Sequence, residues 1–346
     1  MTGSDAPRDG AEGARPGREA LTGARAGRRR RGRGRGEQAM VPDVEFSSYY
    51  GKPVLNRPTW KALDIAGYLY LGGLAGASSL LAAGADATAR PALARTAKLG
   101  AAGAVSLSLV ALVHDLGRPA RFLNMLRVVK PTSPMNLGSW LLAGYAPLTM
   151  AAAAADVAGR YRAVGAAATA GAAALGPAVA TYTAVLLSDT AVPSWHEGHR
   201  ELPFVFAGSA ATAAAGLALA GAPTGQTGPA RRAAVLGTAL ELGAFRVMKR
   251  RMGLAAEPYG TGRPRTLLRA AEALTAGGAV LAASAGRRSR VLGAVAGTAL
   301  LAGSAVLRFG VFHAGVASAE DPKYMVVPQR ERLRARSGAQ GPGGAP

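Results

Sequence analysis

Apolar runs of roughly 20 residues alternate with short polar or basic breaks from about Ala62 to Phe312. A helix needs about 20 apolar residues to cross the hydrocarbon core of a bilayer. The pattern therefore predicts about eight spans, near 62–84, 92–114, 137–155, 163–187, 203–221, 232–248, 267–285 and 290–312. The segments 163–187 and 203–221 carry no charged residue, whereas soluble amphipathic helices have a polar face. We therefore predict an all-α integral membrane protein rather than the alternative, an alanine-rich soluble bundle.

Polar segments flank this apolar region and predict how the chain is organised. Residues 1–39 are rich in glycine and arginine and are expected to be a disordered tail, or to be untranslated if Met40 is the true start. We expect 40–61 to be an extended surface segment. The spans then divide into two four-helix bundles, 62–200 and 201–315, followed by a polar C-terminal tail over 316–346.

Charge and cysteine content restrict the function. The formal net charge of +21 comes largely from loops and ends, and we assign it to the membrane surface rather than to nucleic acid. No apolar stretch follows the N-terminal arginines as it would in an export signal. Cysteine is absent, so the chain cannot bind an iron–sulfur cluster through thiolates. No histidine lies in the middle of a predicted span and no HExxH motif occurs, so we expect neither haem nor a metal site.

Basic residues give the predicted orientation in the membrane. Lysines and arginines between the spans are evenly divided between the two sides. Those flanking the first and last spans decide the matter, because charges close to a span count most. They are Lys52, Arg57 and Lys61, and Lys323, Arg330 and Arg332. We therefore expect a multi-pass protein of the cell membrane with both termini in the cytoplasm.

Polar residues gather at one face of the first four predicted spans. Because consecutive spans alternate in direction, the starts of spans one and three meet the ends of spans two and four. This face receives Asp64, Tyr68, His114, Asp115, Asn136, Trp140, Tyr182 and Asp189, followed by Trp195 and His196. Titratable groups where membrane helices meet water are typical of a proton-coupled redox site. The alternative is an interfacial aromatic belt with helix caps.

Several motifs on this face resemble a known family. They are YYG at 49–51 with Pro53 and Trp60, YLYLGG at 68–73 with Gly76, HDLGRP at 114–119, SPM at 133–135, and YTAVLLSD at 182–189 with Pro193, Trp195 and Leu202-Pro203-Phe204. The HDLGRP and SPM pair is the most specific of these. Together they resemble the NrfD-like family, the membrane subunits of polysulfide-reductase-type molybdoenzyme complexes.

The resemblance implies a quinone-reactive membrane anchor without redox cofactors of its own. Menaquinone would bind in the first bundle and exchange electrons with a four-cluster ferredoxin-like iron–sulfur subunit, which accompanies a molybdopterin catalytic subunit. A quinone needs hydrogen-bond partners for both oxygens and a route for two protons. Tyr68, Tyr182 and His114 are the expected oxygen partners, and Asp64 and Asp115 the expected proton carriers. Arg118, Arg121, Arg127 and Lys130 would dock the iron–sulfur subunit or, alternatively, only set the topology.

The second half contains ionisable residues at membrane depth. Glu241 lies near the middle of the sixth span, Glu272 in the seventh and Arg308 in the eighth. Ionisable residues inside a membrane are costly and commonly mark functional sites, so one prediction is a proton path through Glu241. The alternative is a structural Glu272–Arg308 ion pair with a protonated Glu241 hydrogen-bonded between helices. Rival functions for the whole chain are a secondary transporter, because glycine and proline interrupt its helices, and a purely structural anchor.

Overall fold

The structure, a computed structural model, describes Leu55, Pro58 and residues 60–115, 124–284, 286 and 288–339, with side chains up to 332. These residues contain helices and no strand, which confirms the predicted all-α class. The predicted tail 1–39 and most of the segment 40–61 lie outside the described residues. Helices α4 to α14 belong to one compact unit, residues 55–346.

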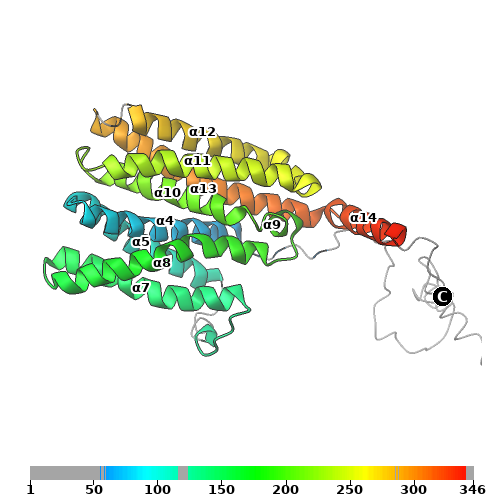
Figure 1. The fold of residues 1–346 in the computed structure, drawn as a ribbon, viewed down its shortest axis with the longest axis horizontal. Helices are drawn as coiled ribbons and strands as arrows, with labels where there is room; N and C mark the ends of the chain where they lie inside the picture. Colours follow the sequence, from blue (N-terminus) through cyan, green and yellow to red (C-terminus); the bar gives the residue numbers. More distant parts are fainter. Residues whose placement is uncertain are drawn as a thin grey trace, which may run out of the picture. The chain divides into compact units, whose positions relative to one another are not determined.

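The described part of this unit contains eight long helices (Figure 1). They are α4 (Ala62–Ala87), α5 (Pro91–Asp115), α7 (Pro134–Ala158), α8 (Arg162–Ser188), α10 (Leu202–Gly221), α11 (Gly228–Arg251), α12 (Gly262–Ser284) and α13 (Arg290–Glu320). Short helices α9 (Pro193–His196) and η1 (Gly253–Gly260) lie in two connections, and α14 (Lys323–Ala339) follows α13. The predicted spans thus correspond to the long helices.

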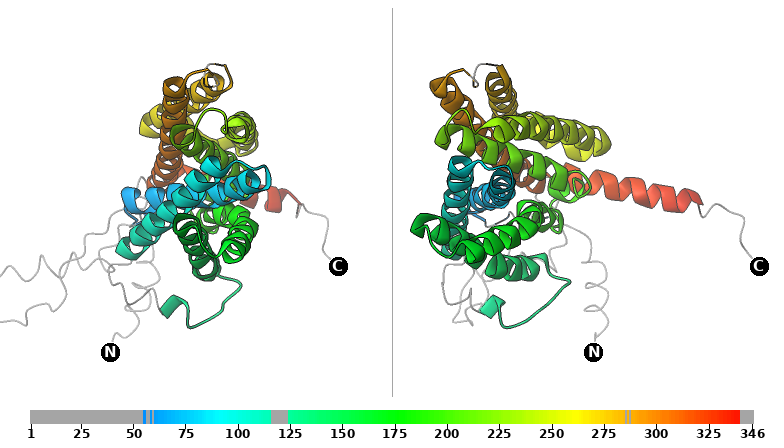
Figure 2. Two further views of the ribbon diagram at one scale, coloured as in Figure 1. Left: turned by 90° about the vertical axis from the view of Figure 1, so that its left-hand side faces the viewer. Right: turned by 60° about the vertical axis from the view of Figure 1, so that its left-hand side comes forward.

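Seven of these long helices are apolar enough to cross a membrane, and α11 is the exception. Basic residues at both ends of α11, together with Glu241 and Arg246 within it, leave no stretch of sufficient length that is apolar enough. It still packs along α10 and runs beside the other long helices (Figures 1 and 2). The sequence prediction of about eight spans agrees with this arrangement.

The long helices pack most closely within two sets, α4 to α8 and α10 to α13. Helix α4 packs against α5 and α8, and α7 packs against α8. In the second set α10 packs against α11 and α13, and α12 packs against α13. Helices α4 and α10 also pack on each other, so the two bundles share a continuous interface (Figure 2).

Small residues allow the helix backbones to approach closely. A Cβ on Gly176 would lie 2.5 Å from the carbonyl oxygen of Gly76, where α8 crosses α4. Gly216 of α10 meets Gly297 of α13 in the same way. Membrane helices depend on such contacts because lipid supplies no hydrophobic force to drive helices together. Gly72, four residues before Gly76, instead faces Ser108 of α5.

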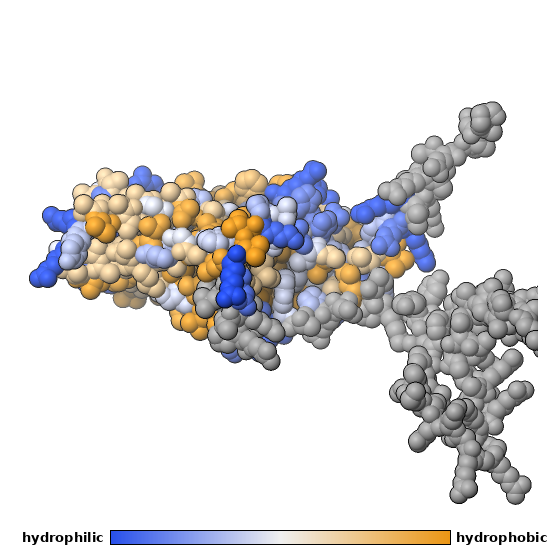
Figure 3. Space-filling model, turned by 90° about the horizontal axis from the view of Figure 1, so that it is seen from below, coloured by the Kyte–Doolittle hydropathy of each residue, from blue (hydrophilic) through white to orange (hydrophobic). Residues whose placement is uncertain are grey.

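The helix ends alternate between two faces of the unit. We call the face where α4 begins the proximal face and the opposite one the distal face. The proximal face also receives the ends of α5, α8, α11 and α13 and the starts of α7, α10 and α12, together with α9, η1 and α14 at the right in Figure 1. Between the hydrophilic left-hand end and right-hand part of Figure 3, apolar residues dominate the visible surface, as expected of a lipid-facing wall.

The C-terminal part differs from the sequence prediction. Helix α13 continues past the predicted Phe312 to Glu320, and α14 occupies much of the predicted polar tail. The extension packs inside the protein, because Ala314, Gly315, Val316 and Ala319 are buried and α13 contacts α9 and η1. A hydropathy pattern detects the apolar run, but it does not detect a helical extension that is stabilised by contacts with other parts of the protein.

Candidate functional site

A carboxylate and an imidazole meet at the proximal face. Asp64 lies in the first turn of α4 and His114 in the last turn of α5, and His114 Nδ1 is 3.0 Å from Asp64 Oδ2. The carboxylate is buried, whereas the imidazole is 64% exposed. The pair therefore links the protein interior to the surface.

Asp115 adds a second carboxylate to this pair. It ends α5, is half-buried, and accepts a hydrogen bond from the backbone of Lys61, just before α4. Asp64 is close enough for the two carboxylates to interact electrostatically. Two acids and one base are thus gathered where α4 begins and α5 ends.

Two tyrosines lie deeper in the same bundle. Tyr68 is one turn beyond Asp64 on α4 and only 3% exposed. Its ring meets that of Tyr182 from α8 edge to face, with centroids 6.4 Å apart. Gly138 of α7 makes room for the Tyr182 ring, because a Cβ there would collide with it. We call Asp64, Tyr68, His114, Asp115 and Tyr182 the Asp64 cluster.

The hydroxyl of Tyr182 is the unusual group of this cluster. It is buried and has no hydrogen-bond partner among the described residues. Leaving a buried hydroxyl unpaired costs about 1–3 kcal/mol, so such groups call for an explanation. An acceptor atom of a bound molecule would supply the missing partner.

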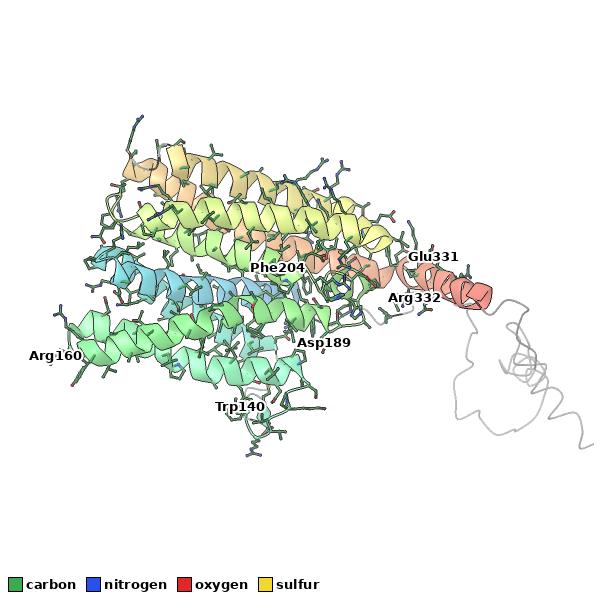
Figure 4. All side chains as sticks on the ribbon, viewed as in Figure 1. Trp140, Arg160, Asp189, Phe204, Glu331 and Arg332 are labelled. Carbon is green, nitrogen blue, oxygen red and sulfur yellow. The ribbon has the colours of Figure 1, made fainter. Side chains whose placement is uncertain are left out.

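Other polar residues predicted for this face have local structural contacts instead. Asn136 accepts a hydrogen bond from the backbone of Lys130 and donates to the carbonyls of Met125 and Val128, which fixes the connection before α7. Trp140, labelled in Figure 4, donates to the same Val128 carbonyl at 3.2 Å. These two residues organise the loop rather than join the Asp64 cluster.

Further residues of this face lie at the end of the first bundle. His196 Nδ1 lies 2.9 Å from the Ser188 carbonyl at the end of α8. Asp189 is exposed at the same helix end (Figure 4). Of the basic residues predicted to dock a partner, Arg127 and Lys130 are exposed in the loop before α7. Arg118 and Arg121 lie outside the described residues.

Trp195 has a larger role than its sequence position suggested. It is fully buried, stacks on Trp60 with centroids 5.9 Å apart, and packs against Phe312 of α13. Its indole N–H donates to the Val311 carbonyl at 2.9 Å. The neighbouring Ser194 donates to Ala255 and accepts from Tyr259 through its carbonyl, both in η1. We call Trp60, Ser194, Trp195, Tyr259 and Phe312 the Trp195 hub, which connects both bundles; the pattern of apolar runs gave no signal for it.

The second bundle contains a separate buried charge pair. Arg308 of α13 is fully buried, lies 3.5 Å from the centroid of the Phe206 ring, and donates to the Phe206 carbonyl at 3.1 Å. Glu241 of α11 is 1% exposed and close enough to Arg308 for their charges to interact. The Glu272–Arg308 pair considered from the sequence is wrong, because Glu272 pairs with Arg246 at 2.9 Å. Sequence position gives depth along α13 but not the direction in which Arg308 points.

Within the described part of the chain, no group of three or more histidine, aspartate or glutamate side chains could hold a metal ion. The carboxylates, imidazole and phenols of the Asp64 cluster can form hydrogen bonds and exchange protons.

Comparison with known proteins agrees with this architecture. The family model described as "Polysulphide reductase, NrfD" matches residues 54–250, which is more than half of the chain and includes the whole Asp64 cluster. The chain belongs to this family, and the predicted resemblance is confirmed. A search of curated proteins found no match.

Proposed function

We propose that the chain is the quinone- or quinol-reactive anchor of a multi-subunit molybdoenzyme-type oxidoreductase. Family membership makes it a membrane subunit of a polysulfide-reductase type of complex. The proposal adds that menaquinone reacts at the Asp64 cluster and exchanges electrons with a partner iron–sulfur subunit of the four-cluster ferredoxin-like type. A molybdopterin subunit would carry out the chemistry on the external substrate.

The observation that carries this proposal is the unpaired hydroxyl of Tyr182, whose ring contacts Tyr68 one turn of α4 beyond the Asp64–His114 pair. A quinone ring presents two carbonyl oxygens at opposite edges, and each needs a donor once electrons arrive. Tyr182 supplies a buried donor without a partner in the described part of the chain. His114 supplies a donor that also reaches water, and it is held in place by Asp64.

Proton transfer explains why carboxylates accompany the histidine. Reducing a quinone to a quinol consumes two electrons and two protons. In this proposal His114 donates a proton towards one quinone oxygen and regains it from water at its exposed edge. Asp64 stabilises the imidazolium form, and Asp115 lies next to the pair as a second proton carrier. Tyr68 stays buried and positions Tyr182 through the ring contact.

The electron donor must approach the same face. The basic loop that contains Arg127 and Lys130 lies at the proximal face, near the start of α7. Its positive charge suits an acidic surface on the iron–sulfur subunit and would steer and orient it. The basic residues flanking the first and last spans favour a cytoplasmic position for this face, in the cell membrane.

Quinone reduction by the assembled complex tests the proposal. Tyr182→Phe, His114→Ala and Asp115→Asn should each lower quinone-linked activity about tenfold or more, the range of a lost proton-transfer group. Activity of the partner subunits with an artificial dye should stay unchanged. Tyr145→Phe is the matched control, because that tyrosine lies on α7 and its hydroxyl is bonded to Ser79 at 2.7 Å.

Three outcomes would count against the proposal. Loss of dye activity in an intact complex would place the residue outside quinone chemistry. Unchanged quinone reduction in all three variants would place the quinone site outside the Asp64 cluster, or outside this chain if it is a purely structural anchor. Substrate uptake into vesicles by the chain alone would favour the transporter.

A further inference from the structure

A cavity of about 570 Å³ opens between α11, α12 and η1 in the second bundle. The outer part of its wall is charged and the inner part is apolar. The charged part holds Arg246 and Lys249 of α11 and Arg265, Arg269 and Glu272 of α12. Leu242, Phe245, Leu268 and Leu307 line the inner part, and Glu241 completes the wall there. The cavity is distinct from the Asp64 cluster, which lies in the first bundle.

Glu241 lies between this cavity and a group of buried polar atoms that have no hydrogen-bond partner among the described residues. Neither carboxylate oxygen of Glu241 has a hydrogen-bond partner among the described residues, and the same is true of Nε and Nη1 of Arg308. The hydroxyl of Thr275 is also unpartnered. The side chains of Ser209, Thr212 and Thr275 face the carboxylate. Buried polar atoms of this kind are normally satisfied by protein or by ordered water.

The position of Glu241 along α11 places these groups well inside the membrane. It precedes Arg251, the last residue of α11, by about 15 Å at about 1.5 Å per residue. Ionisable side chains at such depth are costly unless they face water or an opposite charge. The cavity can hold roughly twenty water molecules at about 30 Å³ each, and its charged wall favours water over lipid chains.

We infer that this cavity is a water-filled proton entry from the proximal face and that Glu241 is the proton-exchanging group at its inner end. The Glu241 side chain has enough rotatable bonds to point either towards Arg308 or into the cavity. In the first position the arginine stabilises its carboxylate. In the second the carboxylate takes a proton from cavity water, and the neutral acid can return to the buried position.

Several other titratable groups face this path and belong to the same equilibrium. They are Arg308 of α13, Tyr70 of α4 next to it, Tyr259 of η1, Arg246 and Lys249 of α11, and Arg265, Arg269 and Glu272 of α12. Arg246 and Glu272 pair with each other at 2.9 Å. Arginine and lysine keep their protons at neutral pH, so the carboxylates are the proton acceptors among these groups. Of these Glu241 alone is buried, because Glu272 is half exposed.

Water access can be measured cleanly because the natural chain contains no cysteine. Leu242→Cys places one thiol in the cavity wall, and Leu240→Cys places one on the outer surface of α11 at nearly the same depth. A charged thiol reagent reacts with the thiolate, which forms in water but not in lipid. In vesicles the Leu242→Cys thiol should react about tenfold faster or more than the Leu240→Cys thiol, and only from the proximal side. Equal rates, or reaction only from the distal side, would overturn the inference.

Proton exchange by Glu241 needs a separate readout. Infrared spectra of the full chain in lipid nanodiscs should show a protonated carboxyl band that disappears in Glu241→Gln and remains in Glu272→Gln. Transfer to heavy water should shift this band without unfolding. A band that does not exchange until the protein unfolds, or that survives in Glu241→Gln, would refute the assignment. Neither measurement depends on quinone activity, so this inference and the quinone proposal can fail separately.

Discussion

Gly76 of α4 and Gly176 of α8 cross with no side chain between them, and a Cβ on either would meet the carbonyl group of the other. This contact holds together the two helices that carry Tyr68 and Tyr182. Its geometry leads to the first of four predictions.

Gly76→Ala should destabilise the first bundle by about 1–3 kcal/mol, because the added methyl group must push two backbones apart. Gly84→Ala on the same helix is the control, since a Cβ there meets nothing within 4 Å. It should stabilise the protein by about 0.5–1 kcal/mol through helix propensity. Unfolding in detergent, followed by circular dichroism, measures both. Equal effects would show that the helices do not cross at Gly76.

Trp195→Ala should cost about 3–5 kcal/mol, because it empties a fully buried site and removes the hydrogen bond to Val311. Trp140→Ala offers a comparison with the same change in size at a residue that is 41% exposed. We expect it to cost less than about 1.5 kcal/mol, mainly through its single bond to Val128. A Trp195→Ala variant as stable as Trp140→Ala would contradict the proposed hub.

An ion pair joins the start of α10 to the end of α11 and should make stability depend on pH. Arg251 donates to both carboxylate oxygens of Glu201, at 2.6 and 2.7 Å, and also to the Glu197 carbonyl. This contact holds the pKa of Glu201 below its usual value. Because the pKa is lowered on folding, the stabilisation is present above the unfolded value of about 4.3 and is lost as pH falls through the folded value.

Glu201→Gln should therefore lose about 1–2 kcal/mol at neutral pH and show a flatter decline in stability below pH ~4.3 than the natural chain. Glu257→Gln is the control, because its partner Lys323 and Glu257 itself are 44% and 41% exposed. An exposed pair contributes about 0–1 kcal/mol. Chemical denaturation across a pH series compares them; parallel curves for the natural chain and Glu201→Gln would disprove the linkage.

Arg127→Glu with Lys130→Glu should release the proposed iron–sulfur subunit from the purified complex, and more readily at high salt. Repulsion at the docking surface and screening of the remaining attraction both act in this direction. Adding Arg121→Glu should strengthen the effect. Arg160→Glu with Arg162→Glu reverses two exposed charges at the distal face, where Figure 4 labels Arg160, and should leave the complex intact. Co-purification over a salt series reports the result. Retention at every salt concentration would leave membrane topology as the role of the basic loop.

The sequence was most informative where a single physical requirement dominates. The length of each apolar run is set by bilayer thickness, so the helices appear close to their predicted bounds. The alternation of spans placed Asp64 and His114 at one face, and the structure brings them to 3.0 Å. A membrane fixes direction and depth, and these two quantities suffice to predict which helix ends meet.

The sequence was less informative about rotation around each helix axis. Asn136 and Asp64 both lie at the proximal face, yet Asn136 turns towards its own loop and Asp64 towards α5. Arg308 faces Phe206 and Glu241 rather than Glu272 for the same reason. Helices built largely of alanine and glycine have little periodic contrast between their faces. Their rotation is therefore decided by close contacts such as Gly73 against Arg308, which no hydropathy pattern records.

The Trp195 hub has a mechanical consequence for the complex. Its stacked rings and hydrogen bonds connect four parts of the proximal face into one rigid layer. These parts are the segment before α4, the α8–α10 connection, η1 and α13. The Asp64 cluster begins four residues beyond Trp60, and the cavity that Glu241 lines also contacts Tyr259 of the same layer. A protein that binds to this layer therefore acts on the surroundings of both sites. Docking of a partner would therefore strain the two proposed proton-exchanging sites together, although they belong to different bundles and share no side chain.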